Sequence, residues 1–161
     1  MQSTGCIMNS TSTDCITKQI LLRVPRTRVW QALTDAQQFG EWFRVKLENA
    51  FAPGAHVRGR VLYPGYEHVP FELTVERMEP ERLFSWRWHP YSGDPEADYS
   101  TEPSTLVVFE LEECEDDTLL TVQESGFDAI PLTRRMEAYR GNEASWAEQM
   151  LNIERYIGGA R

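Results

Sequence analysis

The feature that most constrains the fold is an alternation of apolar and polar residues that runs from Val45 to Gly126, interrupted only at turns. Alternation at every second residue is typical of strands with one covered face and one face open to water. It is clearest where four apolar side chains are separated by single residues, at Val69, Phe71, Leu73 and Val75. The region therefore predicts a run of five or six antiparallel strands.

The turns between these strands carry their own signals. Tyr63-Pro64-Gly65-Tyr66 places proline and glycine at the two central positions of a β-turn, where the backbone geometry favours them. Met78–Arg82 and the acidic segment Glu112–Asp117 are two further connections. We expect strands over residues 57–63, 69–75, 84–88, 105–111 and 118–124.

Helical patterns lie on both sides of the strand run. A first strand is expected at Cys15–Val24, and Pro25 then opens a short helix, because its missing N–H costs nothing in a first helical turn. Asp35, with Gln38 three residues later, resembles a capping box for a second short helix that ends at Phe43.

The last element is a long helix that begins near Thr133 or Glu137. Trp146, Met150, Ile153 and Ile157 stand four, three and four residues apart, and this spacing forms one apolar stripe. Strands and helices occupy separate parts of the chain, which predicts the α+β class. Since only this helix is long enough to cover the sheet, we expect the antiparallel sheet to close over it.

Length and charge restrict the function. The 161 residues predict a disordered leader at 1–13 and one domain at 14–161. A net charge of −9 makes nucleic acid an unlikely partner, because it repels phosphate backbones. No stretch predicts a membrane span or a signal peptide. Cys6, Cys15 and Cys114 suggest neither a zinc site nor a disulfide framework, so we expect a cytoplasmic protein.

Several motifs together resemble a known family. They are Val29–Asp35, Glu41–Phe43, Leu119–Phe127, and Asn142–Trp146 with Leu151 and Tyr156. Over about residues 15–158 the chain resembles the START-like (SRPBCC) superfamily, in the branch related to the C-terminal domain of the Hsp90 ATPase activator. The pattern departs at Ser145, where the family usually has glycine. The resemblance implies a helix-grip fold, with a twisted antiparallel sheet of about six strands around the C-terminal helix and two short helices after the first strand.

The resemblance also implies a hydrophobic cavity between the sheet and the C-terminal helix. The aromatic and apolar residues of the alternating strands point to the same place, because pockets for small molecules are usually lined by such side chains. The alternative is that these side chains fill one another's space as an ordinary core. The expected ligand-binding residues are Trp42, Phe43, Phe71, Leu73, Trp86, Trp88, Phe109, Glu124, Trp146 and Met150.

Glu124 is the one candidate for catalysis. It follows Leu120 and Val122 at every second position, so its carboxylate is expected to point inward, where burial is costly unless the group is paired or faces a wet cavity. It can then bind a ligand hydroxyl or, with a raised pKa, act as an acid or base. The alternative is a glutamate at a strand end that reaches solvent or pairs with an arginine.

The remaining motifs add a loop and exclude a metal site. Residues 89–103 form a long segment rich in proline and acidic residues, and we expect a lid over one mouth of the cavity or a disordered loop. His56, His68 and His89 match no metal signature. We expect no metal and no cofactor.

Three functions follow, in order of preference. The first is the binding of an apolar or aromatic small molecule, lipid-like or polyketide-like. The second is a cyclase or lyase that uses Glu124 as acid or base. The third is a chaperone-partner or stress-response module, although the 161 residues leave no room for the separate chaperone-binding domain of the eukaryotic activator. The sequence does not predict the oligomeric state.

Overall fold

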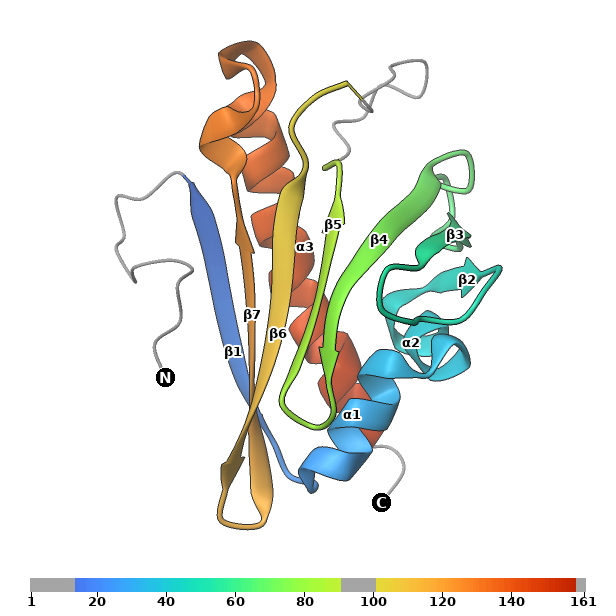
Figure 1. The fold of residues 1–161 in the computed structure, drawn as a ribbon, viewed down its shortest axis with the longest axis vertical. Helices are drawn as coiled ribbons and strands as arrows, with labels where there is room; N and C mark the ends of the chain where they lie inside the picture. Colours follow the sequence, from blue (N-terminus) through green and yellow to red (C-terminus); the bar gives the residue numbers. More distant parts are fainter. Residues whose placement is uncertain (1–13, 91–100, 159–161) are drawn as a thin grey trace.

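A computed structural model describes residues 14–90 and 101–158. One seven-stranded antiparallel sheet has the strand order β1-β7-β6-β5-β4-β3-β2, and the helix α3 (Leu132–Gly158) crosses behind it (Figure 1). The strands are β1 (Cys15–Leu22), β2 (Val45–Leu47), β3 (His56–Val61), β4 (Pro70–Glu79), β5 (Leu83–Trp88), β6 (Thr105–Cys114) and β7 (Asp117–Ser125). The α+β class and the helix-grip arrangement expected from the sequence are confirmed, and the short strand β2 brings the count to seven.

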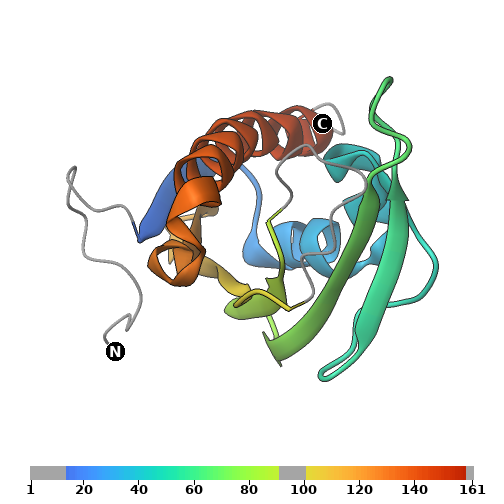
Figure 2. The ribbon, with the colours of Figure 1, turned by 90° about the horizontal axis from the view of Figure 1, so that it is seen from above.

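The sheet curves around the long helix. Seen from above, β1 and the β3–β4 pair lie on opposite sides of α3, and the sheet between them forms the floor (Figure 2). The apolar stripe expected on α3 is buried: Trp146, Met150, Ile153 and Ile157 are each at most 4% exposed. This stripe packs against the inner face of the sheet and forms the core together with buried residues of the two short helices that follow β1, among them Leu33 and Phe39.

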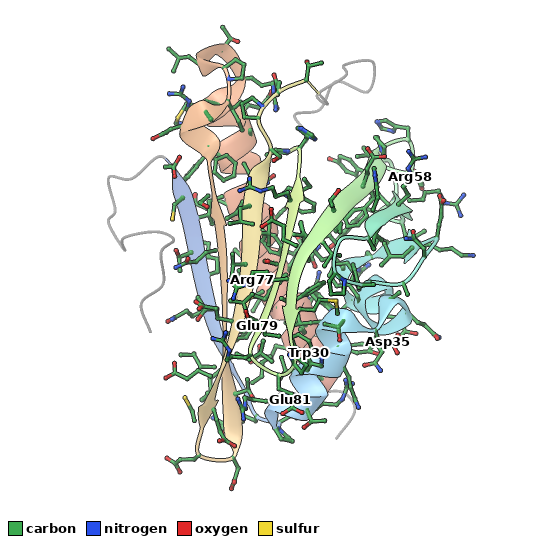
Figure 3. The ribbon with its side chains drawn as sticks, in the orientation of Figure 1. Trp30, Asp35, Arg58, Arg77, Glu79 and Glu81 are labelled. Atoms are coloured by element: carbon green, nitrogen blue, oxygen red, sulfur yellow. The ribbon has the colours of Figure 1, made fainter. Side chains whose placement is uncertain are left out.

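Two short helices, α1 (Arg26–Thr34) and α2 (Ala36–Phe43), follow β1. Asp35 caps α2, since its Oδ1 accepts from the backbone N–H of Gln37 at 2.9 Å and of Gln38 at 3.3 Å (Figure 3). In a full capping box the Gln38 side chain would also accept from the backbone N–H of Asp35. It accepts from Arg28 instead. The helix start predicted from Asp35 is therefore correct, and its mechanism is a simple cap.

Two local features of the sheet follow from the sequence. The backbone N–H of Tyr66 donates to the carbonyl of Tyr63, and Gly65 has a φ of 88°, so the predicted Pro-Gly turn is confirmed. In β4 the register shifts between Val75 and Arg77. This bulge turns Met78 toward the core and leaves Arg77 to pair with Glu79 on the outer face (Figure 3).

The cysteines differ from the expectation. Cys15, at the start of β1, is disulfide-bonded, whereas Cys114 is a free thiol. The spacing of the cysteines predicted no disulfide framework, and the disulfide at Cys15 contradicts this prediction. Spacing alone does not reveal which residues the fold brings together. The inference from free thiols to a cytoplasmic location no longer applies. No helix in the described part of the chain is both long and apolar enough to cross a membrane.

Candidate functional site

Glu124 lies on the inner face of the sheet, one residue before the end of β7. Its strand, β7, is flanked by β1 and β6, and Glu124 is paired there with Ile16 and Val107. The side chains of β7 alternate in burial, and Glu124 is 0% exposed. The inward orientation predicted from the period-two pattern is confirmed. The alternative of a strand-end glutamate that reaches solvent is wrong.

Four neutral side chains donate hydrogen bonds to the Glu124 carboxylate. Oε1 accepts from Trp146 Nε1 at 2.8 Å and from Asn142 Nδ2 at 2.8 Å. Oε2 accepts from Trp88 Nε1 at 2.8 Å and Thr105 Oγ1 at 2.6 Å, and Asn142 Nδ2 also lies 3.0 Å from it. Within the described ranges no arginine or lysine pairs with Glu124, so a buried acid is held by dipoles instead of a cation.

Burial and hydrogen bonding act on this acid in opposite directions. Desolvation raises the pKa of Glu124, and the hydrogen bonds from Thr105, Trp88, Trp146 and Asn142 lower it, with a net rise. Indole and amide N–H groups only donate, whereas a hydroxyl both donates and accepts. The Thr105 hydroxyl, 2.6 Å from Oε2, can therefore accept a hydrogen bond from the protonated acid while the other three groups continue to donate.

We expect the raised pKa to appear as an unusual dependence of stability on pH. Between the ordinary pKa of 4.5 and the raised value, folded Glu124 keeps a proton that the unfolded chain has lost. The free energy of unfolding contributed by this group therefore falls as pH rises, by at most about 1.4 kcal/mol per pH unit. A ¹³C NMR titration of the Glu124 carboxyl carbon measures the pKa directly. A midpoint below 4.5 would show that the hydrogen bonds outweigh burial.

A pocket of about 210 Å³ lies on the other side of the same wall, between β3, β4, β5 and α3. Trp88, Asn142 and Trp146 line it, and each also donates to Glu124. Phe43 from the end of α2, Tyr63 from the turn after β3 and Phe71 from β4 complete the aromatic part of the lining. Glu124 is not part of the lining, so the carboxylate lies behind the residues that face the pocket.

Four of the rings that line this pocket, Phe43, Phe71, Trp88 and Trp146, also pack on one another. The centroids of Trp88 and Trp146 are 6.0 Å apart at an interplanar angle of 31°. Phe43 meets Trp146 at 6.0 Å and 68°, and Phe71 meets Trp88 at 6.0 Å and 83°. Such edge-to-face contacts fix ring orientation. The hydrogen bonds to Glu124 also hold the two indoles, so Trp88 and Trp146 are oriented from two sides without a ligand.

The other expected binding residues lie in the solid core. Trp42 is 2% exposed and its indole N–H donates to the carbonyl of Ala32 at 2.8 Å, so this ring joins α2 to α1. Among the described residues the indole N–H of Trp86 has no hydrogen-bond partner. The expected binding residues that are buried away from the pocket lining are Trp42, Leu73, Trp86, Phe109 and Met150. Much of the volume between sheet and helix is thus filled by side chains.

The geometry of this region can now be compared with known proteins. The sequence profile of the Activator of Hsp90 ATPase homolog 1-like protein family matches residues 23–158. The chain belongs to this family. No curated protein sequence matches it.

Several solved structures have a fold similar to that of this chain. DynU16, a protein of the dynemicin biosynthetic locus, has a TM-score of 0.70 at 23% identity over 92% of this chain, which spans about half of DynU16 (48%). MLL2253 from Mesorhizobium loti has a TM-score of 0.71 at 21% identity, covering 91% and 98% of the two chains. The Aha1 dimer from Colwellia psychrerythraea has a TM-score of 0.64 at 19% identity, covering 89% and 95%. At these identities the likeness shows the fold.

Sequence reasoning missed the polar residues of the site in this family member. Thr105 and Asn142 donate to Glu124, and Tyr63 and Gln149 line the pocket. One signal was available for Asn142: it precedes Trp146 by four residues, and this spacing places both on one face of a helix. Thr105 reaches the site through the pairing of β6 with β5, and Tyr63 reaches it from the turn after β3, and neither placement is visible in the sequence.

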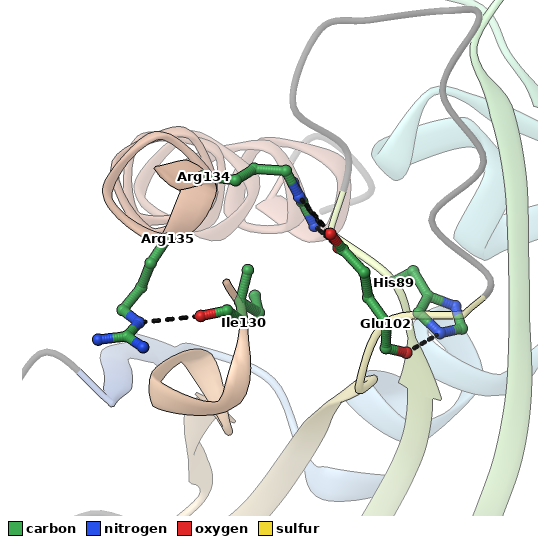
Figure 4. A network of polar contacts seen from close by, with 5 residues as sticks. All are labelled: His89, Glu102, Ile130, Arg134 and Arg135. Carbon is green, nitrogen blue, oxygen red and sulfur yellow. Dashed lines mark hydrogen bonds and ion pairs between the residues drawn. The ribbon is translucent and has the colours of Figure 1, made fainter. Parts of the chain in front are cut away.

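Beside the pocket, an ion pair joins the first turn of α3 to the segment before β6 (Figure 4). Arg134, in the first turn of α3, donates through Nε to Oε1 of Glu102 at 3.0 Å, and these two side chains are 13% and 19% exposed. His89 Nε2 lies 2.9 Å from the Glu102 carbonyl oxygen, and His89 is part of the pocket lining. The lid expected at 89–103 falls largely on residues 91–100, outside the described ranges.

Other surface features fit a ligand site less well. The largest depression, about 750 Å³, lies over β2 and α2, and its lining holds no aromatic ring. Over residues 14–90 and 101–158, no group of three histidine, cysteine or acidic side chains is placed to hold a metal ion. His56 instead forms an exposed contact with Glu72 at 3.4 Å. The pocket beside Glu124 is therefore the best-formed candidate site.

Proposed function

We propose that this chain binds a small apolar or aromatic molecule in the pocket between β3–β5 and α3, and that Glu124 holds the pocket wall in place. The observation that carries the proposal is the shared use of Trp88, Asn142 and Trp146. These residues line the pocket on one side and donate to Glu124 on the other. The hydrogen bonds to the buried acid hold these side chains in one orientation, as a preorganised binding site requires.

The size of the pocket supports a compact ligand. A dry cavity of about 150 Å³ is enough to bind benzene, and this pocket has about 210 Å³. A second, more open pocket of about 560 Å³ shares Tyr63, Asn142 and Gln149 with it. A molecule with one ring or one branched head group fits the inner pocket, and a longer substituent extends into the outer one. The fold of this family often holds hydrophobic ligands, in agreement with this size.

An enzyme that uses Glu124 as acid or base is the second candidate. DynU16 belongs to a biosynthetic locus, and CalU16 from Micromonospora echinospora has a similar fold with a TM-score of 0.57 at 21% identity. A general base must reach the proton that it removes. Both Glu124 oxygens already accept hydrogen bonds, and pocket-lining residues stand between the carboxylate and the pocket. These contacts favour a structural role for Glu124.

A chaperone partner is the third candidate, supported by family membership and by the similar fold of the Aha1 dimer. A protein-binding surface needs a contiguous exposed apolar patch. Large exposed apolar side chains occur on β1, on the β3–β4 connection and on two separate turns of α3: Leu21, Leu62, Tyr66, Leu132, Met136 and Leu151. This scatter favours the small-molecule role, and we expect no stimulation of a bacterial Hsp90 ATPase by the purified protein.

A fluorescence titration tests the proposed function. Cyclohexanol and 3,3-dimethylbutan-1-ol, which do not absorb with tryptophan, are expected to change the tryptophan emission in a saturable way. A Val69→Phe variant fills the space where both pockets meet and is expected to weaken binding at least about tenfold. Val108→Phe adds the same bulk to a strand residue between the inward-facing Val107 and Phe109 and serves as the control. A linear response to both probes would contradict the proposal.

A further inference from the structure

The charges around the two pockets have one sign. Glu72 belongs to the inner lining, and Glu137 and Glu148 belong to the outer one. Among the described residues that line either pocket there is no lysine or arginine, and His89 is the one residue that can carry a positive charge. Glu124 adds a fourth carboxyl group directly behind the aromatic wall.

Each nearby arginine already has a partner. Arg58 pairs with Glu72 at 3.3 Å on the exposed side of the sheet, so the Glu72 carboxylate is compensated. The guanidinium of Arg44 stacks over the Tyr63 ring at 5.3 Å, and Arg134 pairs with Glu102. Glu148 accepts from the Tyr63 hydroxyl at 2.9 Å and has no cation among its described partners. The outer pocket and the wall behind the inner pocket therefore retain uncompensated acidic groups.

The hydrogen-bonding groups of the wall are already in use. The indole N–H groups of Trp88 and Trp146 and the amide N–H₂ of Asn142 all point to Glu124. Gln149 donates to the carbonyl of Phe43 at 3.3 Å and accepts from Asn152 at 3.1 Å. A ligand that needs donors from the two indoles or from Asn142 would find them already bound to Glu124, which costs affinity. The complementary ligand carries charge without requiring a hydrogen bond.

Aromatic rings bind such a charge. The face of an indole ring attracts a cation within about 6 Å, and tryptophan is the best of the aromatic side chains for this contact. The N–H edge of each indole donates to the Glu124 carboxylate, so this positive edge does not oppose a cation in the pocket. Phe43 and Phe71 provide two further rings in the same lining.

We infer, on the basis of the proposed function, that the ligand is a small organic cation of the quaternary ammonium class, held by the rings of Trp88, Trp146, Phe43 and Phe71, with the carboxylates of Glu137 and Glu148 in the outer lining as counter-charges. A quaternary ammonium group has no N–H, so it matches a wall whose indole and Asn142 N–H groups are already bound to Glu124. The net charge of −9 adds a long-range attraction for such a ligand.

Three probes of one shape and different charge test the inference. Choline, 3,3-dimethylbutan-1-ol and 3,3-dimethylbutanoate share a branched head and are titrated into the protein with tryptophan emission as the signal. We expect choline to bind at least about tenfold more tightly than the alcohol, and the carboxylate to show no saturable binding. If the alcohol binds as tightly as choline, the cation inference is wrong and the proposed function stands. If none of the three binds, both fail.

A pair of ring deletions tests the contribution of the aromatic wall. Phe43→Leu removes a lining ring and keeps apolar volume, and it is expected to weaken choline binding several-fold more than binding of the alcohol. Phe51→Leu removes a comparable buried ring outside the lining and serves as the control, with both affinities unchanged. An equal loss for choline and the alcohol in Phe43→Leu would show that shape alone matters, and would overturn the cation inference.

Discussion

The Glu124→Gln variant is expected to unfold with a free energy about 3 kcal/mol below that of the unchanged protein. Glutamine keeps the shape of the side chain and replaces one accepting oxygen by an N–H₂ group. In either amide orientation this group faces donors, because Trp146 and Asn142 point to one oxygen and Trp88 and Thr105 to the other. Each buried donor without an acceptor costs about 1–3 kcal/mol. Relief of the buried charge offsets part of the loss. Urea unfolding at pH 7 measures the difference.

Glu112→Gln is the matched control for this variant. Glu112 lies on the neighbouring strand β6 and is exposed, so the same chemical change is expected to alter the free energy of unfolding by less than about 0.5 kcal/mol. Equal stability of Glu124→Gln and Glu112→Gln would mean that the four donors find other acceptors. The role of Glu124 in holding the pocket wall would then be wrong.

A Gly40→Ala substitution is expected to lower the free energy of unfolding by about 2 kcal/mol. An added Cβ at Gly40 would lie 2.4 Å from the backbone carbonyl oxygen of Val45, where α2 packs against β2. Overpacking of this kind costs about 1–3 kcal/mol, and a backbone atom cannot move aside as a side chain can. Because α2 carries Phe43 into the pocket lining, displacement of the helix is also expected to weaken ligand binding. Urea unfolding and the fluorescence titration measure the two effects.

Gly141→Ala tests the same substitution where space is open. Gly141 lies within α3, and an added Cβ there meets no atom within 4 Å. Alanine is favoured over glycine inside a helix by about 1 kcal/mol, so this variant is expected to gain stability. A loss in both variants, or a gain in both, would show that the α2–β2 contact does not govern the response at Gly40.

Most of the fold could be predicted from the sequence because its signals are local. The alternation in β4 and β7 and the stripe of Trp146 and Ile153 each report burial on one element, and the structure agrees with them. The bulge after Val75 could not be predicted in this way. It depends on how two strands pair, and pairing across the chain leaves no mark on the period of a single strand.

The site was less predictable for the same reason. The inward direction of Glu124 follows from the period of its strand, but its partners come from β5, β6 and α3, so the closed set of donors appears only in three dimensions. The aromatic residues gave no local signal to separate lining from core. Trp86 and Trp88 are two residues apart on one face of β5, and yet Trp88 lines the pocket and Trp86 is enclosed by other rings.

Indole N–H signals in a ¹H–¹⁵N NMR titration test the central claim most directly. The claim is that Trp88 and Trp146 form the wall of a ligand pocket, while Trp42 belongs to the core. On titration with choline and, in a parallel sample, with 3,3-dimethylbutan-1-ol, the Trp88 and Trp146 signals are expected to shift together and to saturate, and the Trp42 signal to stay in place. Unchanged Trp88 and Trp146 signals with both probes, or an equal shift of Trp42, would contradict it.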